Sequence, residues 1–342
     1  METYITTSIT IQKVGTLMAG AVDMHGQICL ADGADFLNSL NDGKAKAILY
    51  DSCEKKGAYD ILKSRVNMEC SNKQDNIKVL GVTRESIYSN DRPLGWLGGY
   101  PSITFAVGCT RVIIDASVPR SENYARFYWD GIQRKKCTVA DTVNLLFYGL
   151  IEETSGNLQR ERRLLKSVGV GSGSINKCIL QAIGTVSESV VTVYASTEAA
   201  VMATCRLTSP NEEFDGFVCG WPTPGSQIKV VDNLMHKLPV GHIEEILVKS
   251  SLLCSGYINN TKANADTFLS DGSVRLGDRG FFNSKSQISV VGRDKNVIIR
   301  DAFVVYPEQL EFRIERCPGV AATAITGVPY AKRYEEICAL LV

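Results

Sequence analysis

The sequence predicts an α/β fold with two unequal parts: a large multi-layer α/β domain, followed by a short α+β segment. Short apolar runs alternate with longer stretches of helical pattern along most of the chain, which is typical of layered α/β proteins. The 342 residues, 44% of them hydrophobic, are enough to bury a large core. The pattern changes near Gly292, and the stretch of about 50 residues beyond it is short for an independent core.

The strands expected in the large part are short and apolar, and several are rich in β-branched residues. They cover Ala45–Tyr50, Thr110–Asp115, Ser189–Tyr194, Ile228–Asp232, Ile243–Lys249 and Gln287–Val291. A charged helix is expected over Leu158–Ser167, and it leads into a glycine-rich loop, GVGSGS, at Gly169–Ser174.

The C-terminal segment carries one helix signal and one strand signal. Pro307 is placed to open a helix that runs through Glu315, because proline is tolerated in the first turn of a helix. The apolar run ICALLV, at Ile337–Val342, reads as a strand, and we expect the chain to be cut off inside it. The boundary between the two parts is expected at Gly292–Lys295.

The composition argues against several classes of function. The 37 basic residues balance the 37 acidic ones, whereas a nucleic-acid-binding protein usually has a basic excess. The 11 cysteines form no CxxC pair and the three histidines are far apart, so neither a zinc site nor a disulfide framework is indicated. No apolar run is long enough to cross a bilayer, and the N-terminus lacks a secretory signal. We therefore expect a cytoplasmic protein without a nucleic-acid partner or a transmembrane segment.

The strongest local motif is YASTE, at Tyr194–Glu198, which follows an expected strand. In open α/β sheets, ligands bind beyond the carboxyl ends of the strands. The hydroxyls of Ser196 and Thr197 could donate to phosphate oxygens there, and the Glu198 carboxylate could hold Mg²⁺, a hard ion that prefers oxygen ligands. The alternative is a helix cap, which is the more common role of such a turn.

Two further motifs place charged groups near turns. The first, DGSVRLGDRG at Asp271–Gly280, contains Asp278, whose carboxylate could accept hydrogen bonds from two ribose hydroxyls. The alternative is an aspartate that bonds to the backbone of its own turn. The second begins at Gly292 and contains Arg293, whose planar guanidinium could bind ribose or phosphate. The alternative there is a polar linker between domains.

The glycine-rich GVGSGS segment matches neither the dinucleotide-binding pattern GxGxxG nor the nucleophile pattern GxSxG. It is better explained as a tight loop that lets a flat ring approach the backbone.

The order of these motifs carries more weight than any one of them: a glycine-rich segment, a strand with STE, then GDRG, GR and PEQLE. This order and spacing closely resemble the adenylate-forming (ANL) superfamily of acyl-CoA synthetases, aryl-CoA ligases, luciferases and adenylation domains. The resemblance extends over nearly the whole chain. It also includes the segments at residues 14–22, 45–52, 91–115, 220–232 and 254–260.

The resemblance implies a domain division and a set of site residues. Residues 1–292 would be a large AMP-binding (adenylation) domain that lacks its N-terminal part, and residues 293–342 a truncated small C-terminal domain. Matching positions imply a catalytic group of Thr197, Glu198 and Lys78, with Glu198 as the Mg²⁺ ligand. They imply a nucleotide-binding group of Ser71, Gly171, Ser172, Gly173, Tyr194, Ser196, Asp278 and Arg293. Lys295 would be the hinge about which the small domain rotates.

The sequence also departs from the family pattern. The family's phosphate-binding loop matches Cys70–Thr83, but Asn72, Asp75 and Val79 replace its glycines, which normally let backbone N–H groups turn toward phosphate. Ala195 replaces a glycine of YGSTE, and Asn296 replaces an aspartate after the hinge. A family glycine of the coenzyme A tunnel is also replaced, by Ala302. No residue matches the adenylation lysine of the family's distal small domain.

The resemblance implies an AMP-forming carboxylate–CoA ligase, an acyl-CoA synthetase that uses ATP, Mg²⁺ and coenzyme A to activate a fatty or other organic acid. The second hypothesis is a catalytically impaired nucleotide- or acyl-binding remnant of such an enzyme. A third hypothesis, an unrelated α/β scaffold protein, is disfavoured by the order of the motifs.

Overall fold

The computed structural model describes residues 4–7, 21–22, 28–29, 78–92, 99, 102–114, 123–144, 146–147, 149, 151, 165–171, 173–175, 177–208, 216–257, 259–300, 303–320, 323–330 and 334–342. Several sequence predictions fall outside these residues. They are the strand Ala45–Tyr50, most of the helix Leu158–Ser167, Ser71 and the rest of the phosphate loop before Lys78, Ser172, and Ala302.

Twelve of the described strands form one hydrogen-bonded sheet, in the order β1-β5-β4-β6-β7-β8-β9-β10-β14-β13-β12-β11. The strands of its first half are β1 (Tyr4–Thr7), β4 (Ile87–Asn90), β5 (Thr110–Ile114), β6 (Val139–Val143), β7 (Ser167–Gly171) and β8 (Val190–Ser196). Those of its second half are β9 (Ala200–Leu207), β10 (Val218–Pro222), β11 (Ser226–Val231), β12 (Glu244–Ser250), β13 (Val274–Phe282) and β14 (Ile288–Arg293). A separate short pair joins β2 (Ala21–Val22) to β3 (Ile28–Cys29).

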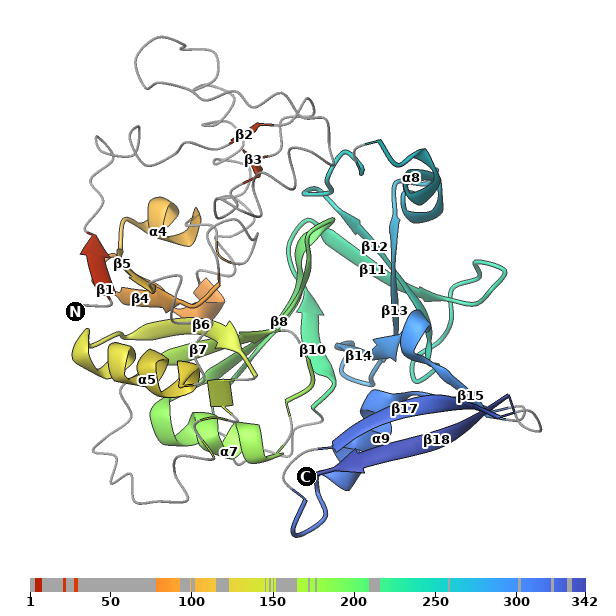
Figure 1. Cartoon of the computed structure of the whole chain (residues 1–342). Helices are drawn as coiled ribbons and strands as arrows, with labels where there is room; N and C mark the ends of the chain where they lie inside the picture. Colours follow the sequence, from red (N-terminus) through yellow and green to blue (C-terminus); the bar gives the residue numbers. More distant parts are fainter. Residues whose placement is uncertain are drawn as a thin grey trace.

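The first half of the sheet is parallel from β5 to β8 and has helices on both faces (Figure 1). One face packs on α5 (Tyr124–Arg134) and α7 (Lys177–Val186), which bury Trp129 and Ile183 against it. The other face packs on α4 (Ser102–Val107). Parallel strands with both faces covered are the arrangement that alternating strand and helix signals predict.

The second half of the sheet is antiparallel and curls around its own core. The change of direction comes at β8, which pairs in parallel with β7 and antiparallel with β9. Strands β9 and β11 are far apart in the sheet order but pack against each other. Tyr194 of β8, Met202 of β9 and Ile246 of β12 share one buried cluster. The curl therefore brings the end of β8 close to strands that lie much later in the sequence.

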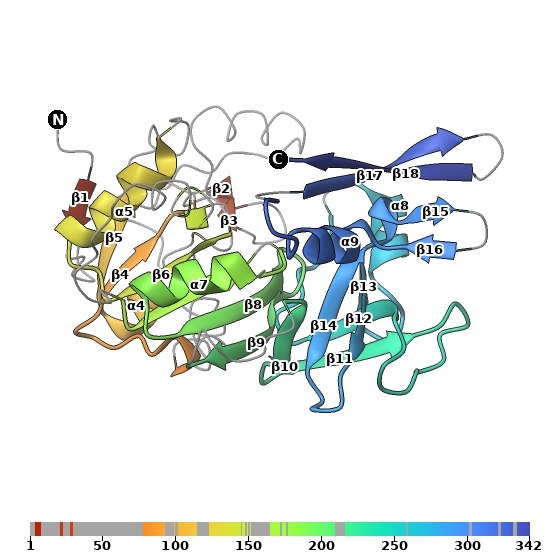
Figure 2. The same ribbon diagram turned by 90° about the horizontal axis from the view of Figure 1, so that it is seen from below.

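A second, four-stranded sheet follows, in the order β16-β15-β18-β17. Its strands are β15 (Ile298–Arg300), β16 (Phe303–Val305), β17 (Thr323–Tyr330) and β18 (Tyr334–Leu341). Helix α9 (Pro307–Ile314) lies between this sheet and β14 (Figure 2). The Phe312 ring of α9 packs against Phe217, with ring centroids 4.9 Å apart. The small sheet is therefore held to the large one through an aromatic contact.

The structure confirms the α/β fold class and most of the expected elements that it describes. Strands lie at each expected position from Thr110 onward, and Pro307 is the first residue of α9, as predicted. The strand expected at the C-terminus is β18. In the part of the chain that the structure describes, no helix is long and apolar enough to cross a membrane.

Two local predictions were wrong in part. The helix expected over Leu158–Ser167 does not reach Ser167, because Ser167 is the first residue of β7. Gly169–Ser174 is predicted to be a loop, but Gly169 and Gly171 belong to β7, between two parallel neighbours, and only Gly173 and Ser174 of the described residues lie outside the strand. A Cβ atom on Gly169 would lie 2.8 Å from the Asp141 carboxylate of β6. The glycine therefore serves close packing between strands rather than a turn.

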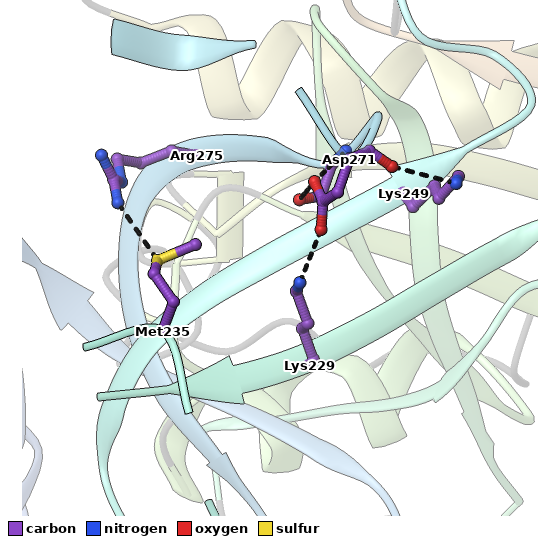
Figure 3. Close-up of polar contacts among 6 residues, drawn as sticks. Lys229, Met235, Lys249, Asp271 and Arg275 are labelled. Carbon is purple, nitrogen blue, oxygen red and sulfur yellow. Dashed lines mark hydrogen bonds and ion pairs between the residues drawn. The ribbon is translucent and has the colours of Figure 1, made fainter. Parts of the chain in front are cut away.

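The Asp271–Gly272 turn, which the sequence predicted, closes just before β13 (Figure 3). Gly272 adopts a φ of +80°, and the Asp271 carboxylate accepts a hydrogen bond from Lys229 of β11 at 2.8 Å. Lys249 of β12 donates to the Asp271 carbonyl at 3.1 Å. The hydrogen bonds of Lys229 and Ser273 hold the pKa of Asp271 below its usual value. The turn is thus tied to strands β11 and β12.

We expect Gly220→Ala to destabilise the fold much more than Gly241→Ala. Both glycines have a positive φ, +109° and +87°, but a Cβ on Gly220 would overlap the Thr204 carbonyl, whereas one on Gly241 meets nothing within 4 Å. Backbone strain alone should cost about 1–2 kcal/mol at Gly241. Strain plus overlap should cost at least about 3 kcal/mol at Gly220. Urea unfolding measures both, and equal losses would contradict the assigned β9–β10 packing.

Candidate functional site

The YASTE motif lies at the carboxyl end of β8, where the parallel half of the sheet meets the antiparallel half. Ser196 Oγ accepts a hydrogen bond from the Ala199 backbone N–H at 3.1 Å, which tightens the turn. The helix-cap alternative is wrong, because the turn leads into strand β9 and not into a helix. Thr197 is exposed and Glu198 is half-buried. The turn therefore lies beyond the carboxyl end of β8, where ligands of open α/β sheets bind.

Asp278 is a buried carboxylate that is joined to this motif through Tyr194. It is 4% exposed. The Tyr194 hydroxyl donates to its Oδ2 at 2.7 Å, and Arg293 Nε forms an ion pair with its Oδ1 at 3.1 Å. Asp278 lies inside β13 and pairs in register with Arg293 of β14, so the alternative of an aspartate bonded to its own turn is wrong. Neither is Arg293 a linker residue, since it ends a paired strand.

Electrostatic effects connect Asp278 to Glu198. Burial raises the pKa of Asp278 above its usual value, although the Tyr194 hydrogen bond and the Arg293 charge act in the opposite direction. The negative charge of Glu198 raises this pKa further, so the two carboxylates interact. Burial, followed by the charge of Asp278, raises the pKa of Tyr194 well above its usual value. The Tyr194 phenol therefore remains a protonated donor across the physiological range.

Glu198 is held by the loop that precedes α8 (Thr261–Thr267). The Tyr257 hydroxyl donates to Glu198 Oε1 at 2.7 Å, and the Cys254 backbone N–H donates to the Glu198 carbonyl at 2.8 Å. Burial and then Glu198 raise the pKa of Tyr257 to about 12. The described residues contain no group of three or more histidines, cysteines or carboxylates that could cage a metal ion. A single carboxylate suits Mg²⁺ that is shared with phosphates, because such an ion keeps waters and phosphate oxygens as its other ligands.

The glycine segment lies beside this turn. Gly171 ends β7 next to Val193 of β8, and Gly173 has a φ of +138°. The Asn144 side chain donates to the Ser174 carbonyl at 2.6 Å, and its amide would lie 3.2 Å from a Cβ on Gly173. Glycine is therefore required by both the backbone and the space available. The approach of an adenine ring to this segment stays a prediction.

Some predicted site residues are not joined to this network by any contact described above. Lys78 is exposed at the start of a helical turn, residues 78–80. Leu80 of this turn packs against the face of the sheet that α4 covers. Lys295 is exposed within the 3₁₀ turn η3 (Asp294–Asn296), directly after Arg293. The roles of Lys78, Thr197 and Lys295 stay predictions, as do those of Ser71 and Ser172, which lie outside the described residues.

The sequence analysis missed Tyr257. It noted the segment at residues 254–260 only as a match to the family and gave this tyrosine no role. The hydroxyl–carboxylate contact joins residues that are 59 positions apart, and no local spacing signals it.

Comparison with known proteins places this site in a family context. Residues 71–258, more than half of the chain, match the AMP-binding enzyme family. A putative acyl–CoA ligase, YdaB of Bacillus subtilis, is 38% identical over 138 residues, which is 40% of this chain and 27% of the relative. The medium/long-chain-fatty-acid–CoA ligase FadD8 of Mycobacterium tuberculosis is 27% identical over 212 residues, or 62% of this chain and 37% of the relative.

Solved structures show the same fold. O-succinylbenzoate coenzyme A synthetase (MenE) from Bacillus subtilis, in complex with AMP, aligns with a TM-score of 0.65 and 21% identity, over 81% of this chain and 55% of that one. ATP-bound MatB from Rhodopseudomonas palustris aligns with a TM-score of 0.67 and 20% identity, over 81% and 53%. The chain thus spans about half the length of these structures and less than half of the two curated relatives.

We expect Asp278→Asn to change the pH dependence of stability. Because the folded pKa of Asp278 lies above its ordinary value, the folded chain binds more protons than the unfolded chain between the two pKa values. The free energy of unfolding of the unchanged chain should therefore fall, relative to Asp278→Asn, as the pH rises from about 4 through the folded pKa. Above that pKa the difference should be constant.

Urea unfolding at a series of pH values measures this difference. Glu198→Gln should make it smaller, because the Glu198 charge is one cause of the raised pKa. A difference that is independent of pH, or that grows in favour of the unchanged chain as pH rises, would contradict the buried environment assigned to Asp278.

Proposed function

The chain belongs to the AMP-binding enzyme family, and from this membership we propose that it is an AMP-forming carboxylate–CoA ligase. It would activate a fatty or other organic acid through an acyl-adenylate, with ATP, Mg²⁺ and coenzyme A. The observation that carries the proposal is the buried Asp278 carboxylate, held between Tyr194 and Arg293 beside the Glu198 turn. The Asp278 carboxylate can accept hydrogen bonds from ribose hydroxyls. Beside it, the turn offers hydroxyl donors for phosphates and the Glu198 carboxylate for a cation.

Asp278 would accept the two hydroxyls of the ribose. Each carboxylate oxygen has two lone-pair sites, and each already accepts one bond, from Tyr194 or Arg293. One further site on each oxygen therefore remains for a ribose hydroxyl. The Arg293 side chain is 55% exposed, so part of its guanidinium is also open to the nucleotide. This supports the predicted ribose role of both residues.

Glu198 fits the Mg²⁺ that the family implies. Its Oε1 accepts from Tyr257, and Oε2 receives no hydrogen bond from the described residues, which leaves an oxygen for a hard cation. When bound, Mg²⁺ would neutralise charge on the phosphates. Thr197, exposed on the same turn, would donate its hydroxyl to the α-phosphate.

The proposed chemistry has two half-reactions. An oxygen of the substrate carboxylate attacks the α-phosphorus of ATP. The bond between the α-phosphorus and the oxygen that bridges to the β-phosphorus breaks, and pyrophosphate leaves. The coenzyme A thiol then gives its proton to solvent and its sulfur attacks the acyl carbon. The bond between that carbon and the phosphate oxygen breaks, and AMP leaves. Asp278 and Arg293 would hold the ribose through both steps, and Tyr194 would hold Asp278 through its hydroxyl. The small domain proposed for residues 293–342 would rotate about Lys295, which lies exposed between β14 and β15.

A second candidate is a nucleotide-binding protein with impaired turnover. It is favoured by the loss of glycines from the phosphate loop. Val79 stands where the family has a glycine, and it is half-buried in the helical turn 78–80, where its carbonyl accepts from Arg206 at 2.8 Å. A backbone tied in this way is poorly placed to cradle phosphate. Asp75, which lies outside the described residues, adds a negative charge to the same loop of the sequence.

We expect Asp278→Ala to weaken AMP binding by at least about tenfold, because a charged hydrogen bond is worth about 1.5–3 kcal/mol. Titration calorimetry with AMP measures the affinity. Asp271→Ala is the matched control, since Asp271 is an exposed carboxylate on the turn before β13, where it forms an ion pair with Lys229. Equal AMP affinity in the unchanged chain and Asp278→Ala would refute the ribose role.

ATP–pyrophosphate exchange separates the two candidates. With a panel of short, medium and aromatic acids, the impaired candidate predicts exchange below about 1 s⁻¹, whereas a working ligase should reach about 1 s⁻¹ or more, the lower end of the rates of working enzymes. Restoring glycines with Asp75→Gly and Val79→Gly should raise the rate by at least about tenfold, because one preorganised donor commonly contributes a factor of about 10²–10³. Exchange at or above about 1 s⁻¹ in the unchanged chain would exclude the impaired candidate.

A further inference from the structure

Tyr257 is fixed at its backbone by Asn264 of α8. Asn264 Oδ1 accepts from the Tyr257 backbone N–H at 2.6 Å, and Asn264 Nδ2 donates to the Tyr257 carbonyl at 2.8 Å. A backbone N–H only donates and a carbonyl only accepts, so the pair of bonds also fixes the orientation of the amide. One side chain therefore holds both polar backbone groups of Tyr257.

The helix that carries Asn264 is itself anchored. The Asn260 side chain accepts from the Ala263 backbone N–H at 3.1 Å and caps the helix. Gly256 has a φ of +134°, and a Cβ there would lie 2.9 Å from Asn264 Oδ1, so a glycine is needed for the chain to pass the amide. The Tyr257 ring also packs edge-on against Phe268, with centroids 5.8 Å apart.

The other end of Tyr257 reaches the site. Its hydroxyl donates to Glu198 Oε1 at 2.7 Å, while the Cys254 N–H of the same loop holds the Glu198 carbonyl at 2.8 Å. The loop thus binds Glu198 at both its backbone and its carboxylate. A glutamate has three rotatable side-chain bonds, and a neutral donor on one oxygen restricts them without adding a charge that repels a cation.

We propose that Tyr257 is a positioning residue: it orients the Glu198 carboxylate toward the divalent cation of a bound nucleotide, and Asn264 holds Tyr257 in place for this task. The inference rests on the proposed function, since it assumes that the nucleotide binds beside Glu198. Partners that orient a metal-binding carboxylate commonly change metal affinity by about 10–100-fold when removed. Tyr257→Phe removes only the hydroxyl and keeps the ring contact with Phe268.

The test is the affinity for ATP at a series of free Mg²⁺ concentrations, measured by calorimetry, with AMP in the absence of metal as the reference. The gain in ATP affinity that Mg²⁺ produces should be about tenfold smaller in Tyr257→Phe than in the unchanged chain. AMP affinity should stay within about twofold. Tyr330→Phe, which removes the hydroxyl of an exposed tyrosine on β17, is the matched control and should change neither value.

A double-mutant cycle distinguishes positioning from a general effect on structure. If Tyr257 acts through Glu198, then Tyr257→Phe should cause no further loss of the Mg²⁺ gain once Glu198→Gln is present. Asn264→Ala should reduce the gain in the same direction. An unchanged Mg²⁺ gain in Tyr257→Phe, or losses that add in the double variant, would overturn the inference while AMP binding upholds the proposed function. Failure of the unchanged chain to bind AMP would overturn both.

Discussion

The burial of the Asp278 carboxylate is the constraint on which the site depends. A buried charge is costly unless it is paired and hydrogen-bonded, and Tyr194 and Arg293 supply both kinds of partner. Tyr194 lies on β8 and Asp278 on β13, four strands away in the sheet order and 84 residues away in the sequence. They meet only because the antiparallel half of the sheet curls. The same curl that closes the second core therefore completes the site.

A second carboxylate near the first supports the proposed binding of a cation. Glu198 raises the pKa of Asp278, which means that their charges repel each other. Arg293 offsets part of this repulsion from the side of β14, and Tyr257 holds Glu198 with a neutral hydroxyl. Neither partner neutralises Glu198 itself. A divalent ion carried by a nucleotide would relieve the repulsion, so metal and nucleotide would stabilise one another at this place.

The sequence predicted the elements of this fold better than its contacts. Strand β8, the turn after it and the proline that opens α9 follow from local pattern and local sterics. The glycines of Gly169–Ser174 predict a loop because glycine allows turns, but Gly169 lies in a strand. There its missing side chain makes room for Asp141 of the neighbouring strand. The partners of Asp278 and Glu198 could not be predicted locally, since they are 84 and 59 residues away. Family resemblance named Asp278 and Glu198 but not Tyr257.

The central claim is that the Asp278 carboxylate binds the ribose hydroxyls of an adenine nucleotide. It is tested most directly by comparing the affinity of the chain for AMP with its affinity for 2′,3′-dideoxy-AMP, which keeps the base and phosphate but lacks both ribose hydroxyls. The account predicts that AMP binds at least about tenfold more tightly, and that this preference disappears in Asp278→Asn. Equal affinity for the two nucleotides in the unchanged chain, or a preference that survives in Asp278→Asn, would contradict it.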